Sequence, residues 1–371
     1  MIIAVNCRLL LKNQLEGIGW FAYETLKRIT RDHPEHQFIF IFDRPYDPGF
    51  IFGDNVQPVV AGPPTRHPLL WYIWFEWRIP RLLRKLHPDL FFSPDGFLSL
   101  RIPVRSITVI HDINFAHRPK DLPWWPRIYY NFFFPRFAGK AEKILTVSEY
   151  SKQDIHKTYH IPESRIRVVY NGAHEKYRPL PEEEIQKVRD RYSGGTPYFI
   201  FIGSLHPRKN LINLLKAFQL FCKQLKSEIK MVIVGEQMWH TSSAKQYLKN
   251  ERVIMTGRLE PGQLRQVLGA ALALTFVPWF EGFGIPVVEA MQAGVPVLTS
   301  HVTSLPEVGG DAVLYADPGS VEEIAAQMKK LATKPELRRN LIEKGLKQAG
   351  NFSWDETAKR VSEEVIKELE G

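Results

Sequence analysis

Short apolar runs alternate with segments of helical periodicity along the whole chain. In the first half, the runs that predict strands are residues 2–6, 37–42, 106–110, 143–147 and 167–170; in the second half, they are residues 198–203, 230–235, 253–256, 272–276 and 295–299. Continuously apolar strands separated by helices are typical of βαβ units with a parallel sheet buried on both faces. The pattern predicts an α/β fold with two doubly wound, Rossmann-like domains facing each other across a cleft.

A polar stretch, residues 174–196, separates the two series of strands and contains PLPEEE and SGG. Such composition is typical of an interdomain connection, so we expect one domain over residues 1–175 and a second over 176–352. A chain of 371 residues is long enough for each domain to bury its own core. Ligands of open α/β sheets bind at the carboxyl ends of the strands, and functional residues should follow the strands directly.

Composition narrows the class of protein. The chain is 44% hydrophobic and 24% charged, as in soluble globular proteins. Its two cysteines, Cys7 and Cys222, lie too far apart in sequence to suggest a disulfide framework or a zinc site. The N-terminus opens directly on a strand pattern, and no apolar run approaches the roughly 20 residues that span a bilayer. We expect a cytoplasmic protein.

The formal charge of +9 is uneven along the sequence: residues 1–180 hold 25 Lys and Arg against 17 Asp and Glu, and the remainder holds 24 against 23. The surplus indicates either an anionic partner or a solvated basic face. Two aromatic segments, residues 71–77 and 123–135, lie in this half, and the first is followed by a series of cations: Arg78, Arg81, Arg84 and Lys85. These segments suit an anionic membrane surface or helices packed on the sheet.

The second half carries three unusual loops after predicted strands. Gly203 to Asn210, GSLHPRKN, joins a glycine turn, the cations Arg208 and Lys209, and a helix starting near Leu211, which together suit a diphosphate. Thr256-Gly-Arg-Leu259 has a glycine that permits close backbone approach by a nucleobase.

The remaining loop runs from Pro278 through Glu281, Gly282 and Gly284 into a helix that contains Glu289. Its glycines let backbone N–H groups approach a ligand, and its two carboxylates can accept hydrogen bonds from sugar or ribose hydroxyls. A glutamate early in a helix is also favoured by the helix dipole, but the apolar neighbours of Glu289 require a partner for its charge.

These motifs resemble those of glycosyltransferase family 4, whose members are retaining enzymes with the GT-B fold. Glu281 and Glu289 match its E-x7-E motif, GSLHPRKN its phosphate loop, and residues 294–318 the segment that follows. The resemblance covers most of residues 197–318 and extends weakly to a C-terminal helix, 353–371, that crosses back onto the first domain. It implies that Glu289 binds ribose and Glu281 the donor sugar, while Arg208 and Lys209 hold the diphosphate. The implied donor site comprises Gly17, Gly19, Gly203, Arg208, Lys209, Gly257, Arg258, Leu259, Glu281, Gly282, Phe283, Gly284, Ile285 and Glu289.

The resemblance also implies a metal-independent reaction without a cofactor, and the sequence holds no Asp-x-Asp pair of the kind that metal-dependent transferases use. The PRKN loop is similar to that of bacterial mannosyltransferases, so GDP-mannose is the first expected donor and a UDP-sugar the second. We expect the acceptor to be a glycan or a lipid-linked molecule, with peripheral association to the inner face of the cytoplasmic membrane and no nucleic-acid partner.

The first half offers two signals. Gly17-Ile-Gly19 reads as G-x-G-x-x-A, which with Asp43 would suit a dinucleotide, but about ten residues separate the first strand from Gly17, and that fingerprint requires a tight turn. The resemblance implies a glycine loop near the donor diphosphate instead. His111-Asp112 follows a strand directly and matches the family's His-Asp element, which implies that His111 supports the donor sugar.

Other classes remain open at this stage. A retaining glycosidase would need two carboxyls about 5–5.5 Å apart, which spacing in sequence does not exclude. A nucleotide-sugar epimerase, a sugar phosphorylase and a non-catalytic GT-B scaffold subunit are further alternatives. Fold alone does not separate them.

Overall fold

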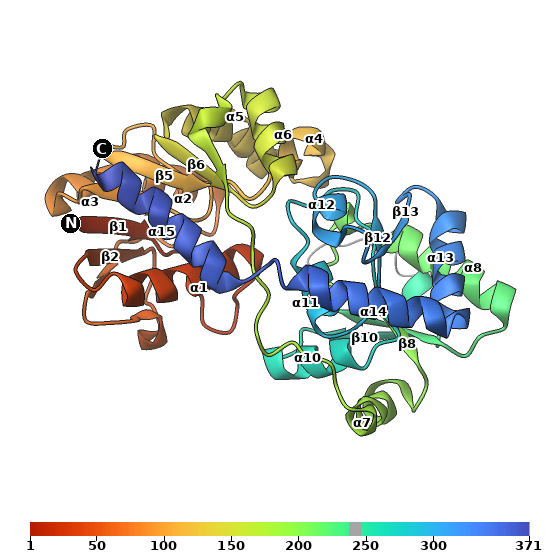
Figure 1. Ribbon diagram of the computed structural model, residues 1–371. Coiled ribbons are helices and arrows are strands. Elements are labelled where there is room, and N and C mark those ends of the chain that lie inside the picture. The colour runs from red at the N-terminus through yellow and green to blue at the C-terminus, as the bar shows by residue number, and fades with distance from the viewer. Residues whose placement is uncertain (237–245, 371) are drawn as a thin grey trace. The chain divides into compact units, whose positions relative to one another are not determined.

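The computed structural model describes residues 1–236 and 246–370, which form two compact units (Figure 1). Unit 1 comprises residues 1–172 and 354–371, and unit 2 comprises residues 173–353. Each unit has its own parallel sheet, covered by helices on both faces.

The sheet of unit 1 has seven parallel strands in the order β3-β2-β1-β4-β5-β6-β7. The strands are β1 (Ile2–Asn6), β2 (Gln37–Phe42), β3 (Val56–Val60), β4 (Leu90–Ser93), β5 (Arg105–Val109), β6 (Lys143–Thr146) and β7 (Ile166–Val168). Five of them lie within two residues of the predicted bounds. The sequence pattern does not predict β3, which is interrupted by a proline, or β4, which has only four residues.

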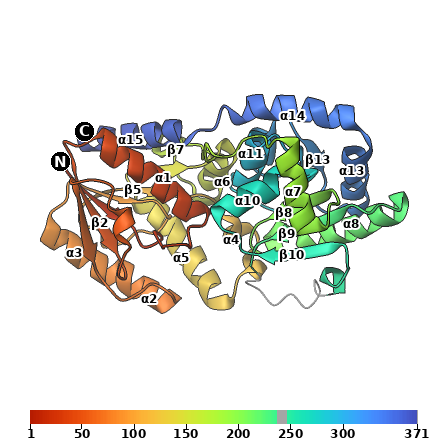
Figure 2. The same ribbon diagram turned by 90° about the horizontal axis from the view of Figure 1, so that it is seen from below.

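Helices cover both faces of this sheet. They are α1 (Gly17–Asp32), α2 (Pro68–Ile73), the π-helical turn η2 (Trp74–Arg78), α3 (Ile79–Leu86), α4 (Asn114–His117), α5 (Trp124–Lys140), α6 (Glu149–Tyr159) and α15 (Trp354–Glu370), with short 3-10 turns at 48–50, 119–121 and 163–165. Figure 2 shows α1 and α15 on one face of the sheet and α2, α3 and α5 on the other.

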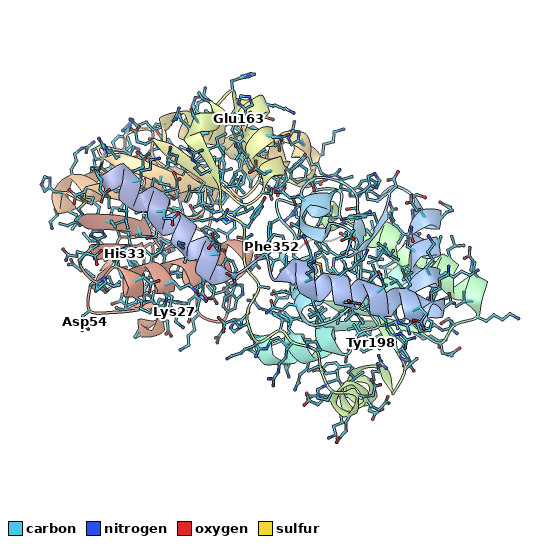
Figure 3. The ribbon with its side chains drawn as sticks, viewed as in Figure 1. Lys27, His33, Asp54, Glu163, Tyr198 and Phe352 are labelled. Atoms are coloured by element: carbon cyan, nitrogen blue, oxygen red, sulfur yellow. The ribbon has the colours of Figure 1, made fainter. Side chains whose placement is uncertain are left out.

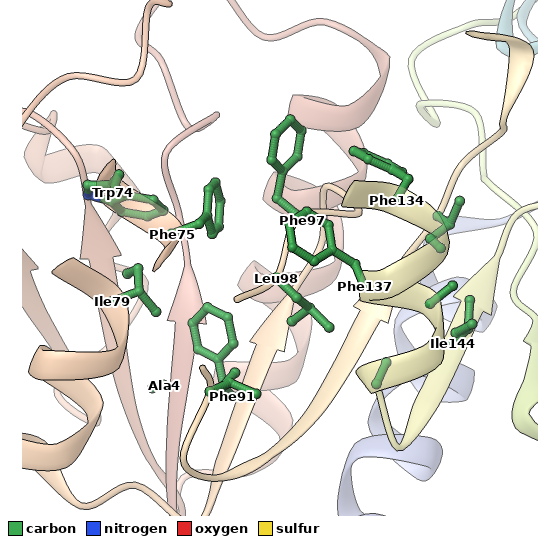
Figure 4. Packing of buried hydrophobic residues seen from close by; sticks show 14 of the residues in the cluster. Ala4, Trp74, Phe75, Ile79, Phe91, Phe97, Leu98, Phe134, Phe137 and Ile144 are labelled. Atoms are coloured by element: carbon green, nitrogen blue, oxygen red, sulfur yellow. The ribbon is translucent and has the colours of Figure 1, made fainter. Parts of the chain in front are cut away.

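The core between the sheet and the second group of helices is largely aromatic (Figure 4). Trp74 of η2 packs edge-on against Phe75, and Phe75 stacks on Phe97. Phe97 in turn contacts Phe134 and Phe137 of α5. The indole N–H of Trp74 donates to the carbonyl oxygen of Ala61 at 2.5 Å, so its buried polar atom is satisfied.

The C-terminal helix α15 packs on α1 in unit 1. Asp355 accepts a hydrogen bond from Arg28 at 2.5 Å, and the hydroxyl of Thr357 donates to the carbonyl oxygen of Tyr170 at 2.6 Å. Phe352 lies in the turn between α15 and the preceding helix (Figure 3). The family resemblance implies such a helix, and the structure describes it over residues 354–370.

The sheet of unit 2 has six parallel strands in the order β10-β9-β8-β11-β12-β13. The strands are β8 (Tyr198–Ile202), β9 (Lys230–Val234), β10 (Val253–Gly257), β11 (Ala273–Phe276), β12 (Val297–Ser300) and β13 (Leu314–Ala316). The helices include α7 (Glu182–Ser193), α8 (Leu211–Leu225), α10 (Pro261–Gly269), α11 (Ile285–Gln292), α12 (Leu305–Gly309), α13 (Val321–Thr333) and α14 (Pro335–Ala349), with a 3-10 turn η5 (Pro207–Lys209). The segment 174–196 is not an extended connection, since most of it forms α7, which packs against α10.

The expected charge asymmetry is wrong at the level of the folded units. Unit 1 holds 26 Lys and Arg against 22 Asp and Glu, and unit 2 holds 23 against 18. The reason is that α15, which carries six acidic residues against three basic ones, belongs to unit 1. Within the described part of the chain, no helix combines the length and the apolar character needed to cross a membrane.

Candidate functional site

Three glycines join the carboxyl ends of β8, β9 and β10. The N–H of Gly203 donates to the carbonyl oxygen of Val234 at 3.0 Å, and the N–H of Gly235 donates to that of Gly257 at 3.0 Å. A Cβ on Gly235 would lie 2.0 Å from the carbonyl oxygen of Gly203, and φ of Gly235 is +149°. Only glycine fits at this crossing, so Gly235 is required for the shape of this edge, although the sequence analysis did not single it out at the end of a predicted strand.

The loop after β8 presents Arg208 and Lys209 from the turn η5. The ring Nδ1 of His206 accepts the N–H of Arg208 at 3.2 Å, which caps the turn. Asn210 follows with φ +60° and donates its side-chain amide to the carbonyl oxygens of Val277 and Pro318 at 2.9 and 2.7 Å. Asn210, which the sequence analysis did not single out, therefore fixes both cations against the loop that carries Glu281.

Glu281 lies after β11 and pairs with both cations. Its Oε2 accepts from Arg208 at 3.0 Å and from the Nζ of Lys209 at 2.5 Å, while Arg208 also donates to the carbonyl oxygen of Phe280. The Nζ of the buried Lys209 lies 4.7 Å from the ring centre of Phe276. Burial alone would raise the pKa of Glu281, but the charges of Lys209 and Arg208 outweigh it and lower that pKa. The carboxylate is held ionised.

The loop after β12 holds the backbone of Glu281. Thr303, with φ +58°, accepts the N–H of Glu281 at 3.2 Å, and the hydroxyl of Ser304 donates to the carbonyl oxygens of Glu281 and Phe283 at 2.9 and 3.0 Å. These bonds fix the backbone that carries the Glu281 side chain. The sequence analysis did not identify Thr303 or Ser304, because a Thr-Ser pair is common in loops.

The start of α11 depends on Gly284. Its φ is +107°, and a Cβ there would lie 2.8 Å from a methyl carbon of Leu305. Gly282 and Phe283 are buried beside it, and Ile285 opens the helix. The backbone therefore turns tightly from Glu281 into the helix, in which Pro286 has no N–H and the N–H of Val287 donates to the carbonyl oxygen of Gly284 at 2.9 Å.

Glu289 is the fifth residue of α11 and is mostly buried. Burial raises its pKa to about 7, and a hydrogen bond from Tyr177 and the charge of Arg265 oppose that rise. The partner that the charge of Glu289 requires is therefore Tyr177, near the start of unit 2. No pattern in the sequence links these two residues. The two carboxylates of the E-x7-E pair differ: Glu281 is ionised, while Glu289 titrates near neutrality.

The predicted nucleobase loop is connected to the same edge. Gly257 ends β10 with φ +69° and has open space where a Cβ would be, followed by the exposed Arg258 and the half-buried Leu259. Because Gly235 bonds to Gly257 and crosses Gly203, these loops form one backbone layer at the carboxyl edge of the sheet.

In unit 1, His111 lies at the carboxyl end of β5. Its Nε2 lies 2.9 Å from the carbonyl oxygen of Pro94, and its ring meets that of Phe21 edge-on at 5.0 Å. A carbonyl can only accept, so Nε2 carries a proton. Burial lowers the pKa of His111, which favours the neutral ring with the lone pair on Nδ1. The adjacent Asp112 accepts from the N–H of Asn114 at 3.0 Å.

The dinucleotide alternative does not fit unit 1. Strand β1 ends at Asn6 and α1 begins at Gly17, so the tight turn of the fingerprint is absent. Asp43 is fully buried, and its carboxylate is occupied by Arg44 and by the N–H and hydroxyl of Thr65. Gly19 instead lets α1 pack closely, since a Cβ there would lie 3.1 Å from the carbonyl oxygen of Leu9.

Among the residues that the structure describes, one group has the geometry to hold a metal ion: His33, Glu35 and His36. It lies between α1 and β2 at the amino edge of the unit 1 sheet and includes none of the candidate site residues.

Comparison with known proteins places these features in a family. The model "Glycosyl transferases group 1" matches residues 182–348, and the model "Glycosyltransferase Family 4" matches residues 15–176. The chain is 31% identical to O-antigen chain mannosyltransferase B of Escherichia coli over 93% of this chain and 94% of that protein. This chain belongs to glycosyltransferase family 4. Within the family it is also 25% identical to O-antigen chain mannosyltransferase RfbU of Salmonella typhimurium, over 72% of each chain.

Solved structures agree on the fold of this family 4 member. HepE of Anabaena in complex with UDP-glucose aligns with a TM-score of 0.77 at 16% identity, over 99% of this chain and 100% of that one. WaaG, a glycosyltransferase involved in lipopolysaccharide biosynthesis, aligns with a TM-score of 0.75 at 17% identity, over 97% and 98%. The fold is GT-B, and the protein is a glycosyltransferase.

Proposed function

We propose that this glycosyltransferase transfers a hexose from a nucleoside-diphosphate sugar to a hydroxyl of a glycan or lipid-linked acceptor, with retention of anomeric configuration and without a metal ion. The observation that carries the proposal is the pairing of Arg208 and Lys209 on one oxygen of Glu281, beside the start of α11. It brings a cation pair suited to a diphosphate, from the loop after β8, onto a carboxylate suited to a sugar hydroxyl, from the loop after β11.

The two carboxylates would divide the donor between them. Glu281, kept ionised by its cations, is a hydrogen-bond acceptor for a sugar hydroxyl and is unsuited to donate a proton. Glu289, in α11, would accept hydrogen bonds from ribose hydroxyls. Tyr177 would act as its positioning residue through the hydrogen bond between them. The loop of Gly257, Arg258 and Leu259 would contact the nucleobase of the donor.

The leaving nucleoside diphosphate gains negative charge as its bond to the sugar breaks. Arg208 and Lys209, with the backbone N–H groups around Gly284 where Gly282 and Phe283 lead into α11, would supply fixed positive charge for it. These groups do the work that a bridging metal does in other transferases, which is why we propose a metal-independent reaction. Gly203 keeps the backbone close to the phosphates.

His111 would accept a hydrogen bond from a substrate hydroxyl at Nδ1, since Nε2 is engaged by Pro94. Such a histidine orients the sugar and is not required as a general base, because an oxygen of the leaving phosphate can take the acceptor proton in front-side displacement.

GDP-mannose is the donor that we propose first, because the two O-antigen relatives described above are named as mannosyltransferases and resemble this chain over most of its length. A UDP-sugar is the second candidate, because the similarly folded HepE is described with UDP-glucose. A scaffold subunit would have no need to keep the ion pairs of Glu281, and neither an epimerase nor a phosphorylase would release nucleoside diphosphate in step with glycosylation of an acceptor.

A thermal-shift panel of GDP, UDP, ADP and dTDP tests the donor base. The preferred nucleotide at about 100 times its dissociation constant should stabilise the protein by roughly 2.7 kcal/mol. Release of free nucleoside diphosphate from the matching sugar donor, dependent on an acceptor glycan, then separates a transferase from a scaffold. Binding without any release would contradict the proposal.

A further inference from the structure

Seven large apolar side chains form an exposed surface on unit 1, which we call the aromatic face. They are Leu69, Ile73 and Trp77 from α2 and η2, and Trp124, Trp125, Ile128 and Phe132 from α5. The spacing of four residues, 69-73-77 and 124-128-132, puts each set on one side of its helix. Trp124 and Trp125 are 60% and 52% exposed.

The two sets lie on neighbouring helices of the same side of the sheet (Figure 2). Trp71 contacts Tyr130, and Tyr72 contacts Phe133, so half-buried rings join the helices between the exposed sets. The inner sides of the same helices supply the core of Figure 4. Packing on the sheet therefore explains the inner rings, whereas the outer ones are left in water.

Cations surround the exposed rings. The guanidinium groups of Arg81 and Arg101 lie 5.4 and 4.5 Å from the ring of Trp77, and that of Arg136 lies 3.7 Å from the ring of Phe132. Segments 66–85 and 118–140 together hold ten Lys and Arg against two acidic residues. Of those two, Glu76 is buried and Asp121 is paired with Arg118.

The helices on the opposite face of the sheet lack this positive surplus, because α1 and α15 together hold eight acidic and six basic residues. Helix α15, packed on α1, carries twice as many acidic as basic residues. Unit 1 is therefore polarised across its sheet, although its net charge is small. Large exposed apolar patches mark interaction sites, and this polarity indicates that the partner is anionic.

We propose that the aromatic face docks unit 1 on an anionic lipid bilayer. Tryptophan rings insert at the boundary between head groups and acyl chains, and arginines beside them bind lipid phosphates while their stems stay in the apolar layer. The inference stands on surface residues alone and does not depend on the donor site.

Flotation with vesicles tests it. The purified protein should rise with vesicles of phosphatidylglycerol and phosphatidylcholine at low salt, and detach at high salt or from phosphatidylcholine alone. The double variant Trp124→Ala/Trp125→Ala should lose binding on the order of tenfold. Arg81→Ala/Arg136→Ala should do the same, with the loss largest at low salt, because each cation near an anionic surface contributes roughly fivefold.

Matched controls lie elsewhere on the molecule. Lys27→Ala removes an exposed cation stacked on Tyr23 from α1, on the other face of the sheet, and Leu346→Ala removes an exposed apolar side chain from unit 2. Both should bind vesicles like the wild type, and circular dichroism should give the same fold for every variant. Equal losses in the controls, or a wild type that stays at the bottom, would overturn the proposal. So would a dimer, seen by sedimentation, that the tryptophan variant abolishes without any vesicle binding in the wild type.

Discussion

Replacing Glu289 by Gln should stabilise the nucleotide-free protein at alkaline pH. Burial raises the pKa of Glu289 from its ordinary value near 4.5 to about 7, despite the hydrogen bond from Tyr177 and the charge of Arg265. Gln has almost the same shape, can still accept from Tyr177, and carries no charge. The variant therefore removes the cost of ionising a buried carboxyl and little else.

The sign and size follow from the pKa. Between pH 4.5 and about 7 the folded protein keeps a proton that the unfolded chain releases, so the stability contributed by this residue falls as pH rises through that window. Above it, the ionised side chain costs about 3 kcal/mol, the free energy equivalent of moving the pKa from 4.5 to about 7. For a domain of this size that corresponds to roughly 6–12 °C in melting temperature.

Calorimetric melts of the wild type and Glu289→Gln near pH 8 and near pH 4 measure this cost of ionising Glu289. The variant should melt higher near pH 8 and the same near pH 4. Glu281→Gln is the control of opposite sign, because the pKa of Glu281 is lowered and its loss leaves Arg208 and Lys209 without their counter-charge. A Glu289→Gln variant that melts at or below the wild type near pH 8 would refute the reasoning.

Three further predictions concern the same unit. Glu281→Ala should keep the affinity for free nucleoside diphosphate and lose transfer, whereas Glu289→Ala should weaken both, as measured by calorimetric titration; equal losses of nucleotide affinity would contradict this division. Arg208→Ala and Lys209→Ala should lower kcat more than they raise KM, and wild-type turnover should survive EDTA, because these side chains neutralise the leaving group. Turnover lost in EDTA and restored by manganese would contradict that role. Gly235→Ala should lower the free energy of unfolding in urea by more than about 2 kcal/mol, because its Cβ would lie 2.0 Å from a backbone oxygen. An unchanged unfolding midpoint would contradict the close approach of Gly235 to Gly203.

The sequence was sufficient for most strands of the two parallel sheets, because continuous apolar runs such as Tyr198–Ile202 are typical of strands buried on both faces. It also put Glu281 in a loop and Glu289 in a helix, as the structure has them, since Gly284 and Pro286 mark that boundary. The short strand β4 escaped because four residues of pattern are too few to separate a strand from a loop.

Contacts between distant segments could not be predicted. Tyr177 binds Glu289, and Thr303 and Ser304 bind the backbone of Glu281. No local sequence pattern distinguishes these three residues, because their hydroxyls reach the glutamates only through the folding of distant segments. The charge asymmetry failed for another reason: the count followed the order of the chain and left α15 with the second half, although the family resemblance implied that this helix crosses back onto the first domain. The functional roles of the donor-site residues stay predictions.

Proton NMR of the transfer product is the most direct test of the proposed reaction. The protein would be incubated in EDTA with GDP-mannose, an α-linked donor, and a mannose-terminated glycan, beside the Glu281→Ala variant. We predict a new glycosidic linkage with the α configuration from the wild type and none from the variant. A β-linked product, or transfer by the variant at the wild-type rate, would contradict a retaining transfer that depends on Glu281.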